Sequence, residues 1–336
     1  MKRPWRGRVL SATLAAVLVG GVSVGLLLRE PRHDLSPHPF NHDRNAIWIE
    51  HRWLTETQPP ALTEQKIRSL SQRGVRYVFP HLIPFDRAGR LPAHDREQMR
   101  AFLATARAVA PEMRVLPWVG GLCVGYKRTR NGTIDLLDLS QRQRMVAECR
   151  GLMDEGFDGI HLNVEPVPNG ADDFLALLRA LRPAVGSSGI LSVTVTRPAP
   201  YSVPTTRNFL WTPEYYARVA MVADQLVVMG YDTALPTRAL YQRYMAYVAQ
   251  AASSALASNA RAHVLIGIPT YDATGLMHRA GVETIENALL GIVLGLRRSG
   301  TDGTFEGVAV YADWTTGDAE WRTYETLWRG GRVEAH

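Results

Sequence analysis

The segment Phe157 to Pro166, with the sequence FDGIHLNVEP, decides how the rest of the chain is interpreted. Apolar and polar residues alternate from Ile160 onward, which is the pattern of a β-strand. One face of this strand carries the polar side chains of His161, Asn163 and Glu165. Burying these groups on a sheet face costs free energy unless they are hydrogen-bonded or used in a site. We therefore expect Glu165, at the end of the strand, to be a proton-transfer group.

Seven more short apolar runs share this character, and each is followed by an amphipathic helical pattern. The predicted strands are 46–50, 75–80, 113–119, 157–164, 189–196, 225–230, 263–268 and 306–312. The predicted helices are 62–73, 93–109, 140–155, 170–182, 212–222, 238–257, 283–298 and 317–328. Eight strand–helix units predict a (β/α)8 barrel, the TIM barrel, as a single α/β domain over 45–332. A doubly wound open sheet is the alternative, but the segment 51–55 after the first strand lacks the glycine loop typical of that fold.

The composition is that of a globular protein with an unusual N-terminus. The 336 residues are 46% hydrophobic and 21% charged, and the net charge of +6 is concentrated at the start of the chain. Four basic residues precede the uncharged run 9–28, namely Lys2, Arg3, Arg6 and Arg8. The remaining charge forms no basic stripe, so we expect no nucleic-acid partner.

The run 9–28 is 20 residues long, enough to cross a bilayer core of about 30 Å. We interpret 1–29 as a signal anchor, with a cleaved signal peptide as the alternative, and 30–44 as a linker. The positive-inside rule places the domain outside the cytoplasm, either anchored to the cell membrane or secreted. Cys123 and Cys149 are expected to be separate buried thiols, because one follows a strand and the other lies within a helix.

In a barrel of this type the active site lies at the carboxyl ends of the strands. The residues there form an aromatic set with several carboxylates. They are His51, Trp53, His81, Trp118, Asn163, Glu165, Arg197, Tyr231, Asp232, Tyr271, Asp272, Tyr311, Asp313 and Trp314. Aromatic rings pack against the apolar faces of sugars, and carboxylates carry out glycosidic acid–base chemistry. This combination favours a glycan-cleaving site.

The chain at this point resembles glycoside hydrolase family 18. The family signature D-G-x-D-x-D-x-E is similar to residues 158–165, and the family motifs S-x-G-G, M-x-Y-D and G-x-P-x-Y are similar to 118–121, 229–232 and 267–271. Trp314 lies where the family has a tryptophan below the sugar. The motifs occur in order along roughly 45–330 and together imply a barrel that acts on N-acetylhexosamine glycans.

The resemblance also implies roles for individual residues. Glu165 would be the general acid, while the acetamido oxygen of the substrate, not a protein group, attacks the anomeric carbon. Tyr231 would hydrogen-bond the acetamido group, with Asp232 beside it and Asn163 in the signature. Trp118, Arg197, Tyr271 and Trp314 are the expected substrate-binding residues.

Two positions depart from the family signature, since His161 and Asn163 replace aspartates. The carbonyl oxygen of Asn163 can accept a hydrogen bond from the acetamido N–H, but it supplies no negative charge. An Asn-x-Glu pair also resembles family 85 endo-β-N-acetylglucosaminidases. His161 could share a proton with Asn163, but we expect it to pack as a neutral group in the core. A simpler interpretation of Glu165 is an ion pair with Arg197.

Three functions remain open from the sequence. The first is an extracytoplasmic hydrolase of β-linked N-acetylhexosamine glycans, such as cell-wall or chitin-like polymers. The second is a glycosidase on other sugars with a carboxylate such as Asp232 as nucleophile or base, and the third is a non-catalytic glycan-binding barrel. We expect a monomer whose partners are a glycan and, through its N-terminus, a membrane. No His, Asp or Glu cluster shows metal-ligand spacing, so neither a metal nor another cofactor is expected.

Overall fold

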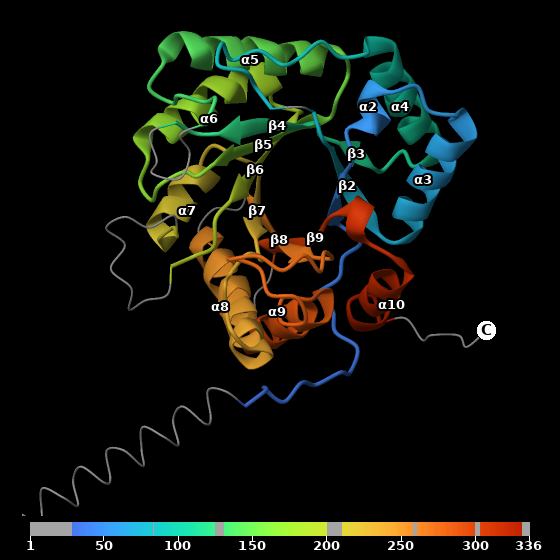
Figure 1. Ribbon diagram of the computed structural model, residues 1–336, viewed down its shortest axis with the longest axis vertical. Coiled ribbons are helices and arrows are strands. Elements are labelled where there is room, and N and C mark those ends of the chain that lie inside the picture. Colours follow the sequence, from blue (N-terminus) through green and yellow to red (C-terminus); the bar gives the residue numbers. More distant parts are fainter. Residues whose placement is uncertain are drawn as a thin grey trace, which may run out of the picture.

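The computed structural model describes residues 29–82, 84–124, 131–199, 210–257, 261–299 and 303–330. Its centre is one all-parallel sheet with the strand order β3-β2-β1-β9-β8-β7-β6-β5-β4. The strands curl around a common centre and the helices lie outside them (Figure 1). The chain therefore has an α/β fold of the TIM-barrel type, as the sequence predicts.

The strands begin and end within a few residues of their predicted bounds. They are β1 Asn45–Ile49, β2 Val75–Pro80, β3 Arg114–Val115, β4 Trp118–Leu122, β5 Gly159–Glu165, β6 Ile190–Val195, β7 Gln225–Met229, β8 His263–Pro269 and β9 Phe305–Tyr311. β3 and β4 are the two halves of the one strand predicted at 113–119. The interruption contains Pro117, which has no N–H to donate to a neighbouring strand.

The interrupted strand joins the two ends of the sheet. β3 pairs with β2, whereas β4 pairs with β5. Just beyond β2, His81 forms a bridge with Trp118, and the Leu82 amide donates to the Trp118 carbonyl at 2.9 Å. The ladder therefore runs around the barrel, and the carboxyl ends of all strands lie at one rim.

The predicted helices are all present, with two short additions. They are α3 Pro60–Gln72, α4 Arg96–Val109, α5 Leu139–Asp154, α6 Asp172–Val185, α7 Pro213–Ala220, α8 Arg238–Leu256, α9 Ile285–Ser299 and α10 Asp318–Leu327; α2 Arg52–Thr55 and the 3-10 turn η1 Asp313–Thr315 were not predicted. Side chains cap several of them. The Asp95 carboxylate, for example, accepts from the amides of Glu97 and Gln98 at the start of α4.

The barrel interior contains a chain of buried polar groups around His161. The Trp48 indole N–H donates to His161 Nε2 at 3.1 Å, so this nitrogen is an acceptor and the proton resides on Nδ1. Nδ1 then donates to the Ser192 hydroxyl at 2.9 Å, and Ser192 donates to Gln225 at 2.7 Å. Burial lowers the pKa of His161 to about 3. The interpretation of His161 as a neutral core group is thus confirmed. The two cysteines are also free and buried, as predicted.

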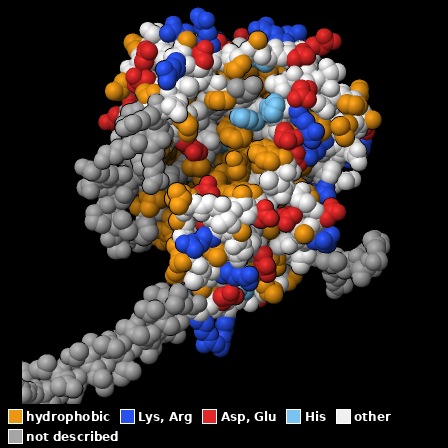
Figure 2. Space-filling model, in the orientation of Figure 1, with side chains coloured by type: hydrophobic (Ala, Val, Ile, Leu, Met, Phe, Trp, Pro, Cys, Tyr) orange, Lys and Arg blue, Asp and Glu red, His pale blue; other side chains and the backbone are white. Residues whose placement is uncertain are grey.

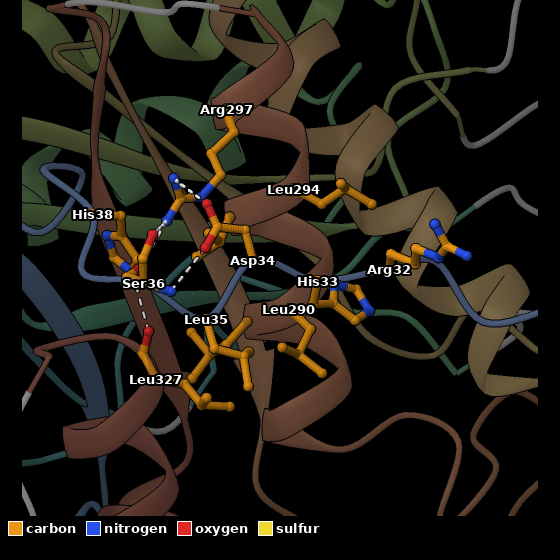
Figure 3. A pocket seen from close by; sticks show the side chains of 12 residues that line it. Arg32, His33, Asp34, Leu35, Ser36, His38, Leu290, Leu294, Arg297 and Leu327 are labelled. Atoms are coloured by element: carbon orange, nitrogen blue, oxygen red, sulfur yellow. Dashed lines mark hydrogen bonds and ion pairs between the residues drawn. The ribbon is translucent and has the colours of Figure 1, made fainter.

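The predicted linker 30–44 lies against the barrel, on the outer side of α9 and α10. Arg297 of α9 pairs with Asp34 at 3.1 Å and donates to the Ser36 carbonyl at 2.7 Å, as Figure 3 shows. His38 Nε2 lies 3.0 Å from the Leu327 carbonyl oxygen, and a cavity of about 100 Å³ remains between this segment and α9.

The structure leaves the predicted membrane segment untested. None of the helices in the described part of the chain combines the length and hydropathy needed to cross a bilayer. The predicted signal anchor at 1–29 lies, except for Arg29, outside the described residues.

Candidate active site

Glu165 is the last residue of β5 and lines a cavity of about 330 Å³ at the carboxyl rim of the barrel. This volume is within the range of ligand pockets. The cavity is lined by residues from β4 to β8 and the loops that follow them: Leu122, Val164, Glu165, Pro166, Val167, Thr194, Thr196, Arg197, Trp211, Met229, Tyr231, Asp232 and Met277. The molecular face in Figure 2 is hollowed at its centre, and hydrophobic side chains line much of the hollow.

Burial sets the protonation of Glu165. It raises the pKa of the carboxyl group above its ordinary value, and the negative charge of Asp232 raises it further. A hydrogen bond from Asn163 and the positive charge of Arg197 act in the opposite direction without reversing the shift. Glu165 is therefore suited to hold a proton and to donate it, which is the behaviour of a general acid.

The interpretation of Glu165 as one half of an ion pair with Arg197 is not supported. Among the described residues, the ion pairs do not include one between these two side chains. Arg197 lines the cavity and donates a hydrogen bond to the Tyr231 carbonyl. The guanidinium thus holds the chain just beyond β7 and adds a positive charge to a cavity that Glu165 and Asp232 also line.

Asn163 lies one pleat below Glu165, where it pairs in register with Gly120 of β4. Gly120 has φ of +151°, and a Cβ built on it would lie 1.7 Å from the Asn163 carbonyl oxygen. Only glycine permits this approach, which explains the glycines of the motif at 118–121. The side-chain oxygen Oδ1 of Asn163 is buried and has no hydrogen-bond partner among the described residues. Such an acceptor is costly to leave unpaired.

Tyr231 and Asp232 follow β7 directly and form the wall of the cavity near Glu165. The Tyr231 side chain is buried, which raises the pKa of its hydroxyl well above the ordinary value. Asp232 has φ of +54°, a left-handed conformation that aspartate tolerates. The Tyr271 hydroxyl donates to Asp232 Oδ1 at 2.7 Å. Tyr271 thus orients this carboxylate, although it does not line the cavity.

The two predicted tryptophans lie to one side of the cavity, and neither lines it. The Trp118 ring lies 4.2 Å from the His81 ring, while the Trp314 ring is 43% exposed. Both approach Tyr311 at the end of β9, with ring centroids 6.4 and 5.9 Å from it. Both tryptophans therefore lie on the side of the site where Tyr311 lies.

Tyr311 connects the parts of the site, and the sequence analysis placed it at a strand end without giving it a role. Its ring stacks on Tyr231 at 4.7 Å and lies 5.9 Å from Tyr271. Burial raises the pKa of its hydroxyl, and the charge of Glu165 contributes. Its place at a strand end beside Trp314 was the available signal.

A second group missed by the sequence analysis lies behind Asp232. His278 and Glu283 come from the segment between β8 and α9 and are both buried. Their ligand atoms and that of Asp232 all lie within 4.8 Å of one another. They are 46 residues or more from Asp232 in the sequence, so spacing rules for metal ligands do not detect the group.

Comparison with known proteins finds similarity in structure alone. No family model matches the chain, and no curated protein matches its sequence. Among solved structures, a chitinase from Chromobacterium violaceum is 15% identical, with a TM-score of 0.59 over 86% of this chain and 99% of that one. The spore cortex-lytic enzyme SleL of Bacillus cereus is 12% identical, with a TM-score of 0.57 over 83% and 73%. A mutant family 18 chitinase from Cycas revoluta, in complex with (GlcNAc)4, is 15% identical, with a TM-score of 0.55 over 85% and 99%.

These similarities confirm the fold that the motifs imply. The chain shares the barrel fold of these solved structures, and the identities of 12–15% carry the comparison no further than the fold. Chemistry and substrate must be argued from the cavity itself.

Proposed function

We propose that this protein is an extracytoplasmic glycoside hydrolase that cleaves β-linked N-acetylhexosamine glycans by substrate-assisted acid catalysis. The observation that carries this proposal is the environment of Glu165. Its carboxyl group lies at the carboxyl end of a barrel strand, lines a cavity of ligand size, and has a raised pKa because of burial. These properties are those of a glycosidic general acid.

In the proposed reaction Glu165 donates its proton to the glycosidic oxygen as the bond to the anomeric carbon breaks. The acetamido oxygen of the same sugar attacks that carbon and forms a cyclic oxazolinium intermediate. Glu165, now ionised, then removes a proton from the water that opens the ring. No protein nucleophile is required.

Tyr231 is suited to hold the attacking acetamido group. A tyrosine hydroxyl is protonated at neutral pH, and burial raises the pKa of Tyr231 further above its ordinary value. It can therefore donate a hydrogen bond to the acetamido oxygen. Tyr311, stacked on Tyr231 at 4.7 Å, fixes the orientation of the ring. Asp232 borders the same cavity, and its charge helps to stabilise the positive intermediate.

Asn163 takes the place of the charged residue in the related family. Its Oδ1 atom is buried without a partner, and the acetamido N–H is a donor of the kind it lacks. Because Asn163 is neutral, the raised pKa of Glu165 depends on burial and on Asp232. The acid is thus tuned without the charge of the family aspartate.

The choice of substrate rests on the N-terminus and on the structural relatives. A protein anchored by residues 1–29 at the extracytoplasmic face of the cell membrane would meet cell-wall glycan. The relatives include a spore cortex-lytic enzyme and chitinases. The proposed substrate is therefore a cell-wall or chitin-like polymer.

The test is release of reducing ends by the purified full-length chain from peptidoglycan, chitooligosaccharides and a high-mannose glycopeptide. Glu165→Gln should abolish release from the substrate that the wild type cleaves. Glu64→Gln, an exposed change on α3, is the matched control and should retain activity. Release by Glu165→Gln at the wild-type rate would refute the proposal, and so would no release from any substrate by a folded wild type.

A further inference from the structure

The group formed by Asp232, His278 and Glu283 has the composition of a cation site. His278 Nδ1 lies 3.7 Å from Asp232 Oδ1 and 3.5 Å from Glu283 Oε2. These separations exceed those of hydrogen bonds, which are about 2.7–3.2 Å. Two ligands bound about 2.0–2.2 Å from a tetrahedral ion lie about 3.4 Å apart. The imidazole is thus placed at the distance that a shared metal ion requires from both carboxylates.

The hydrogen-bond partners in this group are distributed unevenly. Glu283 Oε1 accepts from the Thr233 hydroxyl at 2.8 Å and from the Thr233 amide at 3.1 Å, and Asp232 accepts from Tyr271 at 2.7 Å. Both carboxylates are therefore held in place by donors behind them. His278 is 4% exposed, and neither ring nitrogen has a hydrogen-bond partner among the described residues. An imidazole buried in this way, with nothing bound to it, loses hydrogen bonds that water would supply.

A cation bound to this group would offset a buried negative charge. Glu283 is completely buried, and within the described part of the chain its ion-pair partner is His278. Asp232 shares that partner. The Asp232 side chain is half exposed to solvent, so the buried negative charge of the group is that of Glu283. A divalent ion offsets both carboxylates and leaves the imidazole neutral, with a lone pair to bind it.

We propose that Asp232, His278 and Glu283 bind a divalent cation of the zinc type, with one nitrogen and two oxygen ligands. Three protein ligands and a vacant fourth position are typical of zinc sites that also bind water or substrate. Thr233 and Tyr271 donate hydrogen bonds that orient the two carboxylates, as residues hydrogen-bonded to metal ligands commonly do. Asp232 and Met277, the residue before His278, line the cavity that contains Glu165, so the site borders that cavity.

This site departs from the expectation drawn from residue spacing, which was that the chain binds no metal. The site shares Asp232 with the proposed hydrolysis, and a bound ion would reduce the negative charge that Asp232 presents to Glu165. The two proposals are tested separately, because binding of the ion is measurable without any turnover. The matched variants are His278→Gln, which removes the nitrogen ligand, and His94→Gln, which changes a partly buried histidine in the segment before α4.

The experiment is calorimetric titration of the metal-stripped full-length protein with zinc chloride, followed by X-ray absorption of the zinc-loaded wild type. We expect one zinc ion to bind per chain. The affinity for zinc should be lower by about tenfold or more in His278→Gln and unchanged in His94→Gln. The absorption spectrum should show nitrogen and oxygen ligands with a single imidazole. The spectrum needs no variant, so it applies even if His278→Gln does not fold.

Several results would overturn the site. They are no zinc binding by the stripped wild type, equal affinity in folded His278→Gln and wild type, or a spectrum with no imidazole or with several. Absence of zinc binding would leave the three residues as a group of ion pairs without a metal. Failure of the zinc site with Glu165-dependent hydrolysis intact would leave the proposed function standing, and the reverse result would leave the zinc site standing.

Discussion

His161 should make the stability of the protein fall steeply in mild acid. Its pKa is about 3 in the folded protein because of complete burial, against an ordinary value of 6.5. Between these two values the unfolded chain binds a proton that the folded chain does not, so unfolding is favoured as the pH decreases. Each pH unit is worth about 1.36 kcal/mol, so at about pH 4.5 this residue lowers the free energy of unfolding by about 2.7 kcal/mol. Above pH 6.5 it has no such effect.

The assay is chemical denaturation of wild type and His161→Gln at a series of pH values from neutral to acid. The variant is expected to lose stability at neutral pH, because the hydrogen bonds to Trp48 and Ser192 change. The informative quantity is the slope. Below pH 6.5 the variant should lose about 1.4 kcal/mol less per pH unit than the wild type. His94→Gln is the control and should keep the wild-type slope, since this histidine lies in the segment before α4 and not in the barrel interior. Parallel slopes for wild type and His161→Gln would refute the assignment of His161 as a buried neutral group.

Three further predictions concern the site and the strand beside it. Turnover should require protonated Glu165 and should therefore fall as the pH rises through the raised pKa of this group. The midpoint of the alkaline limb of the pH–rate profile should lie above 4.5, the ordinary pKa of a glutamate. A midpoint at or below 4.5 would contradict the acid role. Asn163→Ala should lower kcat on the order of 100-fold, by analogy with the loss of one hydrogen bond to a reacting group, and steady-state kinetics would contradict this if kcat were unchanged. Gly120→Ala should lower the melting temperature far more than Gly170→Ala. A Cβ at Gly120 would lie 1.7 Å from the Asn163 carbonyl oxygen, whereas nothing lies within 4 Å of a Cβ at Gly170. Equal melting temperatures of the two variants would contradict this prediction and show that the strand relaxes freely.

The sequence was sufficient to predict the barrel because each strand is a short apolar run between helical patterns. The strands of a barrel are buried on both faces, as all five residues of β1 are, and such runs are easily recognised. The division of one strand into β3 and β4 follows from Pro117, but the bridge between His81 and Trp118 that completes the ring is a long-range contact. Short elements such as α2 and η1 contain too few residues to produce a periodic pattern.

The site was predictable where its residues lie within motifs at strand ends. Glu165, Tyr231 and Asp232 were selected in this way, and the structure brings them to one cavity. Tyr311 was recognised at a strand end, but its stacking on Tyr231 depends on the closing of the barrel. His278 belongs to no motif, and only the fold brings it to Asp232 across a separation of 46 residues.

The central claim, that the acetamido group of the substrate acts as nucleophile, is tested most directly with N-acetylglucosamine thiazoline, a stable mimic of the oxazolinium ion. Calorimetric titration of the full-length protein should show one molecule bound per chain, and this binding should weaken in Asn163→Ala. The thiazoline should also inhibit glycan hydrolysis competitively. A protein that hydrolyses its glycan through Glu165 but does not bind the thiazoline would contradict the account and indicate a carboxylate such as Asp232 as nucleophile or base.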